Sequence, residues 1–149
     1  MIYLKDIIKA DYVAFLETTD KDATLNELIH LMDNSENILD KEKFREAVFQ
    51  REQIVSTGIG LGMAIPHVKI KEVADITIGI GIVRKGIDWN AIDNKPVHVV
   101  FLIAASDEQH EKYLRILAKI VLVMKNQSRR EKLLKAESAE EVISLFENV

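Results

Sequence analysis

The sequence predicts an α/β protein in which helices cover both faces of a central β-sheet. Segments with helical periodicity alternate with β-rich segments along the 149 residues, and no linker separates them. Residues 74–84 and 96–105 are rich in β-branched side chains, and the run 97–105 is almost continuously apolar. Such a run is typical of a strand buried on both faces, which requires helices on each side of the sheet.

The composition is that of one globular domain spanning residues 1–149. Hydrophobic residues make up 48% of the chain, charged residues 30%, and the formal net charge is -4. Acidic and basic residues are interleaved, so no basic patch for nucleic acid is expected. No apolar run is long enough for a signal peptide or a membrane span, so we expect a cytoplasmic protein without membrane insertion. The absence of cysteine excludes disulfides, a thiolate nucleophile and thiolate metal sites.

The first part of the chain predicts one strand and two helices. The apolar run 11–16 is consistent with a short strand, and hydrophobic residues recur at helical spacing over 23–32. A second helix is expected to start after Asp40, a good N-cap residue, and to run to about Arg51. A glycine-rich segment follows this helix.

Two closely spaced glycines mark the first of the two expected strands. In the stretch "TIGIGIV", isoleucines on one face alternate with Gly79 and Gly81 on the other. Glycines on one face of a strand indicate that another element approaches closely. A tightly packed helix or loop explains this pattern better than a ligand does. Turn residues at Lys85-Gly86 and Asn94-Lys95 separate the two strands.

The last part of the chain predicts three helices. Ser106 is followed three residues later by Gln109, the pattern of a capping box that begins a long helix. Two short helices are expected to close the chain, the last capped by Ser138 with Glu141. The apolar face of the long helix is expected to contain Leu114, Leu117, Ile120, Val121 and Met124.

The stretch "STGIGLGMAIPH", residues 56–67, combines three glycines with a proline placed directly before a histidine. It is not a P-loop, because no lysine follows the glycines until Lys69 and Pro66 lies where a helix would have to run. The glycines also lack the spacing of a dinucleotide-binding fingerprint. The remaining interpretation is a loop whose backbone N–H groups approach an anion.

His67 is the candidate nucleophile of this segment. Pro66 holds the chain extended into His67 and so fixes the direction of the imidazole. A neutral imidazole can carry a phosphoryl group on one ring nitrogen, and that chemistry requires no metal or other cofactor. Arg51, at the end of the second expected helix, offers a guanidinium fork for phosphoryl oxygens. The spacing alone leaves a structural role for His67 open.

The other histidines are candidates of different weight. His110 lies in the first turn of the long helix, where the positive end of the helix dipole favours an anion, but a solvated first-turn residue fits equally well. His98 is expected to be a packed or partly exposed strand residue, and His30 is expected to face solvent. A zinc site built on His67 and His110 lacks further ligands at familiar spacing, so no metal is expected.

The stretch "REQIVSTGIGLGMAIPH" resembles the active-site signature of enzyme IIA domains of the fructose/mannitol type in the bacterial sugar phosphotransferase system. Nitrogen-related regulatory enzyme IIA proteins share this signature. The resemblance extends to "GIDWNAIDNKPVHVVFLIAA" and to the helix with "QHEKYLRILAKI". It implies a three-layer α/β/α sandwich with a mixed central β-sheet, in agreement with the expected elements.

The resemblance also implies roles for individual residues. His67 would accept a phosphoryl group from the phosphohistidine carrier HPr or a similar carrier and pass it to an enzyme IIB. Arg51 would stabilise phosphoryl charge, and His110 would be the second active-site histidine, beside His67. The loop lining the site would contain Ser56, Thr57 and Gly58. No cofactor is implied.

Two other functions remain compatible with these residues. The first is a regulatory module whose phosphorylation state is read by partner proteins. The second is an interaction domain without transfer activity, as in the cytoplasmic domains of some anion transporters; the presence of Arg51, His67 and His110 argues against it. Val68 departs from the small residue common in relatives, and its branched side chain is expected either to narrow the approach of the phosphoryl donor or to select a particular partner.

Overall fold

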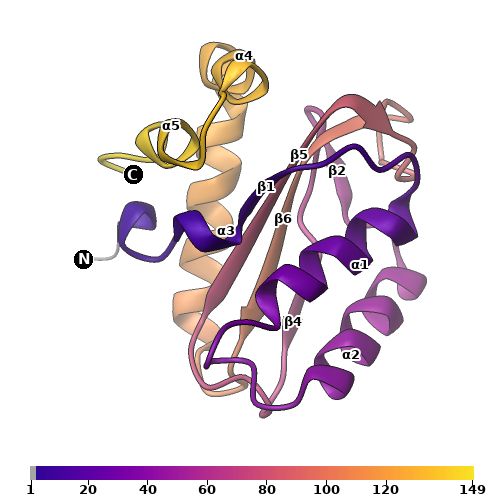
Figure 1. Ribbon diagram of the computed structural model, residues 1–149, viewed down its shortest axis with the longest axis vertical. Helices are drawn as coiled ribbons and strands as arrows, with labels where there is room; N and C mark the ends of the chain where they lie inside the picture. The colour runs from indigo at the N-terminus through magenta and orange to yellow at the C-terminus, as the bar shows by residue number, and fades with distance from the viewer. Residues whose placement is uncertain (1–2) are drawn as a thin grey trace.

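Three layers of secondary structure form the computed structural model, which describes residues 3–149 (Figure 1). Helices α1 (Lys21–Met32) and α2 (Lys41–Ile54) cover one face of a mixed, six-stranded sheet. Helix α3 (His110–Lys125) lies against the other face, followed by α4 (Gln127–Lys135) and α5 (Ala139–Ser144). The expected three-layer α/β/α sandwich with a mixed central β-sheet is therefore confirmed.

The sheet has the order β1-β5-β6-β3-β2, and β4 pairs with β6 beyond β3. Strands β5 and β6 are antiparallel, whereas β1 runs parallel to β5, and β3 and β4 run parallel to β6. Met63 pairs with Val99 and His67 pairs with Ile103, so β3 and β4 occupy successive parts of the same edge of β6. The strands are β1 (Val13–Phe15), β2 (Gly58–Gly60), β3 (Met63–Ala64), β4 (His67–Lys69), β5 (Thr77–Ile87) and β6 (Val97–Ala105).

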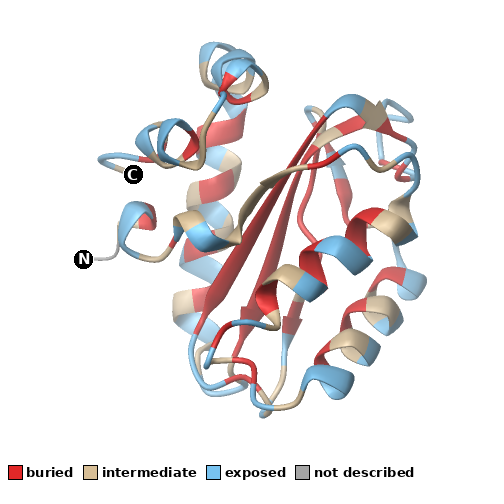
Figure 2. Cartoon of the chain, in the orientation of Figure 1, coloured by how far each residue is buried: buried red, intermediate tan, exposed pale blue. Residues whose placement is uncertain are grey.

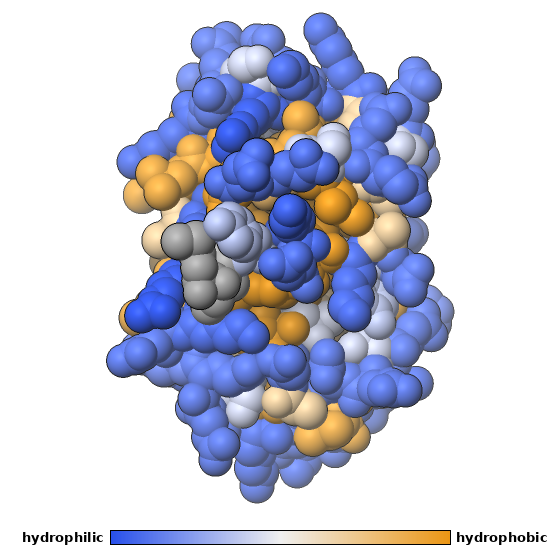
Figure 3. All heavy atoms as spheres, turned by 90° about the vertical axis from the view of Figure 1, so that its left-hand side faces the viewer, coloured by the Kyte–Doolittle hydropathy of each residue, from blue (hydrophilic) through white to orange (hydrophobic). Residues whose placement is uncertain are grey.

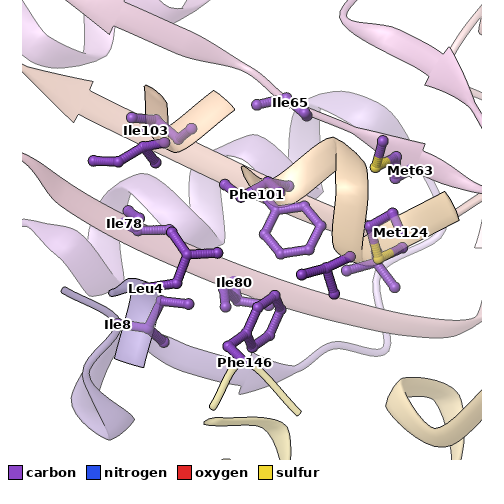
Figure 4. Close-up of a cluster of buried hydrophobic side chains, with 14 of the residues drawn as sticks. Leu4, Ile8, Met63, Ile65, Ile78, Ile80, Phe101, Ile103, Met124 and Phe146 are labelled. Atoms are coloured by element: carbon purple, nitrogen blue, oxygen red, sulfur yellow. The ribbon is translucent and has the colours of Figure 1, made fainter. Parts of the chain in front are cut away.

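A separate hydrophobic core lies on each face of the sheet, and Figure 2 shows the central strands as almost entirely buried. The core on the α3 side contains Ile78, Ile80, Phe101 and Phe146 (Figure 4). The rings of Phe101 and Phe146 meet edge to face with centroids 6.0 Å apart. The core on the other side packs α1 and α2 against the sheet. Burial on both faces explains why β6 is apolar along almost its whole length, with His98 as the exception.

Helix α1 packs directly onto the glycine face of β5. A Cβ atom added to Gly79 would lie 2.7 Å from Sδ of Met32, and one added to Gly81 would lie 3.2 Å from a methyl group of Leu28, both on α1; the Gly81 atom would also lie 2.9 Å from Leu16, which follows β1. Neither position has room for a side chain. The prediction that these glycines admit a closely packed element is confirmed, and that element is α1.

The predicted helix caps at Asp40 and Ser138 are also confirmed. The carboxylate of Asp40 accepts the N–H of Lys43 at the start of α2. The hydroxyl of Ser138 accepts the N–H of Glu141 in α5. These side chains satisfy N–H groups that have no partner within the helix.

Several predicted boundaries of strands are wrong. The run 11–16 contains only the short strand β1, preceded by the 3-10 helix η2 (Ala10–Tyr12). The expected turn at Lys85-Gly86 lies inside β5, where the register against β6 shifts between Ile82 and Ile87. Gly86 has a φ of +81°, a conformation open to glycine, so this residue makes an irregularity in the strand rather than its end. The glycine-rich segment is not all loop, since it contains β2 and β3.

Helix α3 begins later than predicted, and its buried face differs from the predicted one at Leu114. Its first residue is His110, and only half of the capping box forms: the Gln109 side chain accepts the N–H of Ser106 at 3.1 Å. The Ser106 hydroxyl accepts the N–H of Glu108 instead of that of Gln109. Ile120 and Met124 are buried as predicted, and Leu117 and Val121 pack against the core partly buried, but Leu114 is 48% exposed, contrary to the prediction. The buried side of the helix also contains Tyr113, Ile116 and Val123.

The two ends of the described chain lie on one side of the molecule (Figure 1). The 3-10 helix η1 (Leu4–Asp6) begins with Leu4, whose N–H donates to the carbonyl of Val149 at 2.9 Å. This side of the surface is largely hydrophilic, with hydrophobic atoms in a central hollow and in small patches (Figure 3). Over residues 3–149, no helix combines the length and the apolar character that crossing a bilayer would require.

Candidate functional site

His67 is the first residue of β4, and its ring folds back onto the chain that precedes it. Its Nδ1 atom lies 2.5 Å from the carbonyl oxygen of Ile65. A carbonyl oxygen only accepts hydrogen bonds, so Nδ1 carries the proton and Nε2 carries the lone pair. Pro66, between the two residues, holds the backbone that makes this contact. The neutral ring is therefore nucleophilic at Nε2.

The surroundings of His67 favour the neutral ring. Burial lowers its pKa below the ordinary value of 6.5, and the positive charge of Arg51 acts in the same direction. The hydrogen bond to Ile65 and the charge of Glu52 oppose this effect without reversing it. At neutral pH the lone pair of Nε2 is thus available for reaction.

Tyr113 joins the two candidate histidines. The centroid of its ring lies 5.7 Å from that of His67 and 6.4 Å from that of His110. Tyr113 is three residues after His110 on α3, and it is buried between the helix and the sheet. The structure therefore brings the rings of His67 and His110 to one aromatic side chain, although they belong to different elements.

Lys69 also belongs to this cluster, and the sequence analysis missed it. Its Nζ atom lies 2.6 Å from Nδ1 of His110 and 5.9 Å from the centroid of Tyr113. None of the ion pairs found among residues 3–149 includes Lys69. Two patterns in the sequence point to these residues: Lys69 is two positions after His67 on a strand, and Tyr113 is three after His110 on a helix.

Arg51 lies in the last turn of α2, as predicted. Its Nη1 atom donates to the carbonyl oxygen of Val55 at 3.1 Å, just past the end of the helix. Its charge lowers the pKa of His67 and partly offsets the rise that burial causes in the pKa of Tyr113. The bond to Val55 uses one N–H of the guanidinium and leaves its other donors available.

The three predicted loop residues are occupied by contacts within the protein. The N–H and hydroxyl of Thr57 donate to one carboxylate oxygen of Glu52 at 3.2 and 3.0 Å. The N–H of Gly58 donates to the Ser56 hydroxyl at 3.1 Å, and that hydroxyl donates to the Trp89 carbonyl at 2.6 Å. The expectation of free N–H groups facing an anion is therefore wrong for Thr57 and Gly58. These bonds instead stiffen the segment before His67.

Val68 does not narrow the approach to His67, contrary to the expectation. Successive side chains of a strand point to opposite faces, so Val68 faces away from His67 and Lys69. It is 6% exposed and belongs to the core on the α1 and α2 side of the sheet. Its branched side chain fills that core.

The remaining histidines lie outside this cluster. His30 is exposed on α1, as predicted. His98 is partly buried on β6 with Nδ1 3.1 Å from the carbonyl of Arg84, also as predicted. Within the described part of the chain, no three His, Cys, Asp or Glu side chains are grouped so that they could hold a metal ion. A zinc ion at His67 and His110 would therefore lack a third protein ligand of these types.

Known proteins resemble this chain in sequence over most of its length. Residues 6–149 match the family described as "Phosphoenolpyruvate-dependent sugar phosphotransferase system, EIIA 2". A fructose-specific EIIA component from Haloferax volcanii is 31% identical over 129 residues, which is 87% of this chain and 84% of that protein. A fructose-specific EIIABC component from Bacillus subtilis is 32% identical over 131 residues, 88% of this chain, but the match spans only 21% of that longer protein.

Solved structures show the same fold. The nitrogen regulatory protein IIA-Ntr from Neisseria meningitidis superposes with a TM-score of 0.89 at 28% identity, covering 96% of this chain and 98% of that one. The IIA mannitol protein from Escherichia coli superposes with a TM-score of 0.80 at 17% identity, covering 93% and 98% of the two chains. The chain therefore belongs to the EIIA 2 family of the phosphoenolpyruvate-dependent sugar phosphotransferase system.

Proposed function

We propose that this protein is a phosphoryl carrier, which accepts a phosphoryl group on His67 from HPr or a similar phosphocarrier and passes it to an enzyme IIB. The observation that carries the proposal is the bond from Nδ1 of His67 to the Ile65 carbonyl, which leaves Nε2 as the nucleophile. The names of the fructose-specific relatives support the phosphotransferase reaction, and the name EIIABC supports an EIIB partner.

The transfer is an in-line displacement at phosphorus. The lone pair of Nε2 on His67 forms the new N–P bond while the N–P bond of the donor phosphohistidine breaks. The electron pair of the broken bond returns to the donor's imidazole, which then takes up a proton. The positive charge that the His67 ring gains is stabilised by the Ile65 carbonyl, to which Nδ1–H donates. Transfer to enzyme IIB repeats the displacement with His67 as the donor.

Three side chains around Tyr113 stabilise charge on the equatorial phosphoryl oxygens. Arg51 supplies a guanidinium and Lys69 supplies an ammonium group. An ammonium only donates, so its contact with Nδ1 of His110 requires that the neutral His110 ring carries its proton on Nε2. His110 thereby becomes an N–H donor for the transferring group. Ser56, Thr57 and Gly58 contribute by holding the chain that leads to His67.

A regulatory role is the second candidate function. A nitrogen regulatory protein homolog from Haemophilus influenzae is 33% identical over 104 residues, covering 68% of this chain and 63% of that protein. Phosphorylation adds a charge of about -1.5 to -2 at neutral pH, which is enough to change a docking surface. Both functions use the same chemistry at His67 and differ in which partner reads the result.

We further propose that residues 1–149 act as one domain in the cytoplasm, because the two cores share one sheet and phosphoenolpyruvate-dependent transfer starts from a metabolite of the cell interior. No bound metal or other cofactor has a part in the proposed step. The sugar, if one is transported, does not contact this domain.

The experiment is phosphorylation with phosphoenolpyruvate, enzyme I and HPr, followed by quantification of acid-labile phosphate. The parent protein should gain one phosphoryl group, and His67→Ala should gain none. His30→Ala is the matched control, because it removes an exposed histidine outside the cluster; it should be labelled like the parent. Labelling of His67→Ala at the parent level would refute the assignment of His67.

A further inference from the structure

We propose that the ion pair between the partly exposed Lys21 and the buried Glu52 positions the ring of His67 through a chain of hydrogen bonds that ends on Nδ1. This inference rests on the proposed role of His67 as phosphoryl acceptor. It assigns a positioning function to two residues of α1 and α2 that are not part of the cluster around Tyr113.

The chain of hydrogen bonds is continuous. Nζ of Lys21 lies 2.7 Å from Oε1 of Glu52, and the same oxygen accepts the N–H and hydroxyl of Thr57 at 3.2 and 3.0 Å. The carbonyl of Thr57 accepts the N–H of Ile65 at 3.0 Å. The carbonyl of Ile65 accepts Nδ1–H of His67 at 2.5 Å. A displacement of Glu52 is thus passed to the imidazole through the backbone of two residues, Thr57 and Ile65.

Trp89 holds the middle of this chain in place. Its indole N–H donates to the Thr57 hydroxyl oxygen at 3.1 Å, so that hydroxyl accepts from Trp89 and donates to Glu52. Nζ of Lys21 lies 3.3 Å from the Trp89 carbonyl oxygen and 5.4 Å from the centroid of its ring. Trp89 is fully buried. The Thr57 side chain therefore has one orientation in which both of its bonds form.

The burial of Glu52 is difficult to explain by stability alone. Its side chain is 5% exposed, and Oε2 has no hydrogen-bond partner within the described residues. A buried carboxylate oxygen without a partner destabilises the folded state, and apolar replacements of buried ion pairs are often neutral or stabilising. Departures of this kind are expected where a group serves function. Here the charged pair lies at the origin of the bonds that reach His67.

The tautomer of His67 is the property that this chain controls. The tautomer of an imidazole is set by the hydrogen bond that one of its nitrogens makes. While the Ile65 carbonyl stays in place, the proton remains on Nδ1 and the lone pair on Nε2. If the carbonyl moves, the proton can occupy Nε2, and that nitrogen can no longer attack phosphorus.

The test compares Glu52→Ala with the parent in two measurements. Ring ¹⁵N NMR of labelled histidine, recorded above pH 7, should show the Nδ1–H tautomer of His67 in the parent and a shift towards Nε2–H in the variant. The rate of phosphoryl acceptance at saturating phospho-HPr should fall about tenfold or more, because a displaced reacting group no longer has the geometry that the reaction requires. The KM for phospho-HPr should change little, since Glu52 is buried.

Further variants separate positioning from a loss of stability. Thr57→Val removes one bond of the chain and should give the same shift to a smaller extent, which keeps the test usable if Glu52→Ala does not fold. Lys21→Arg keeps the cation and should resemble the parent more closely than Lys21→Met. Val48→Ala is the control, because Val48 is buried on the same helix as Glu52 but takes part in no hydrogen bond of the chain. In this variant, His67 should have the same tautomer as in the parent.

The inference is overturned if folded Glu52→Ala, or Thr57→Val in its place, keeps the parent tautomer. It is also overturned if Val48→Ala shows the same shift. The NMR measurement does not depend on phosphorylation, so it decides the positioning role even if His67 proves not to accept a phosphoryl group.

Discussion

The two histidines that share Tyr113 are held in different ways. His67 starts a strand, is half-buried, and has its ring fixed by a backbone carbonyl. His110 starts a helix, is exposed, and has its ring in contact with the flexible side chain of Lys69. In the proposed function, a nucleophile that must meet phosphorus in line needs a fixed direction, whereas a supporting donor must adjust to two different partners. The backbone provides the first property and a surface side chain the second.

Removal of the His110 side chain has the largest expected effect and tests whether the two histidines have these different roles. His110→Ala should still accept phosphate on His67 but do so more slowly, because one donor to developing charge is lost. Loss of a preorganised donor reduces rates by about 10²–10³, an upper guide for an exposed group. Rapid-quench measurement of single-turnover transfer gives the rate. Complete loss of acceptance would show that the two histidines are equally essential and would break the comparison.

Arg51→Lys tests whether the guanidinium has a geometric role beyond its charge. The variant keeps the positive charge near His67 but loses the planar fork, so transfer should slow by about tenfold or more. Arg45→Lys, on the same helix and bonded to Asn26, is the matched control and should transfer at the parent rate. Equal transfer rates for Arg51→Lys and the parent would show that Arg51 contributes only its positive charge.

Lys69→Gln should have a smaller effect, because the side chain is exposed and its charge is screened. Interactions of this strength change rates by about two- to fivefold, and the difference from the parent should shrink as salt is added. Lys71→Gln removes an equally exposed lysine just beyond β4 and serves as the control. A salt-independent decrease would mean that Lys69 acts by orienting His110 rather than through its charge.

The smallest expected effect in this comparison of the two histidines is the pH dependence of His67. Burial lowers the pKa of His67, so an NMR titration of its ring should have a midpoint below 6.5. Below pH 6.5 the unfolded chain binds a proton at this residue that the folded chain does not, so stability falls as pH falls towards the folded pKa. His67→Ala should lack this part of the pH dependence in urea unfolding. A midpoint at or above 6.5 would show that the ring is solvated like a surface histidine.

Much of the fold was predictable because its determinants are local. The apolar run of β6, the glycine face of β5 and the caps at Asp40 and Ser138 each follow from neighbouring residues. The start of α3 was predicted too early, because the side chains of Ser106 and Gln109 make their hydrogen bonds within a turn that precedes the helix. The irregularity at Gly86 depends on the register with β6, which no local pattern reveals.

The site was predictable only in its histidines and Arg51, whose residue types suggest chemistry on their own. Lys69 and Tyr113 join them because β4 lies beside the start of α3, which is a property of the sheet order. Glu52 gave no indication of burial, since an acidic residue near the end of a helix is normally solvated. Its partner Lys21 belongs to a different helix, and only the packing of α1 and α2 onto the sheet brings the two together.

The parallel pairing of β4 with β6 determines how much of the chain must be synthesised before the protein can carry out phosphoryl transfer. His67 lies opposite Ile103, so its strand has no partner until the chain has been made well past that residue. Pairings between distant residues form late, after local helices such as α1 and α2. In a nascent chain that ends before β6, the edges of β3 and β4 that pair with β6 are left open, in a form prone to association with other chains. Helix α3 must also leave the ribosome before His110 and Tyr113 can reach β4. The protein therefore gains the ability to transfer phosphoryl groups only when folding is complete.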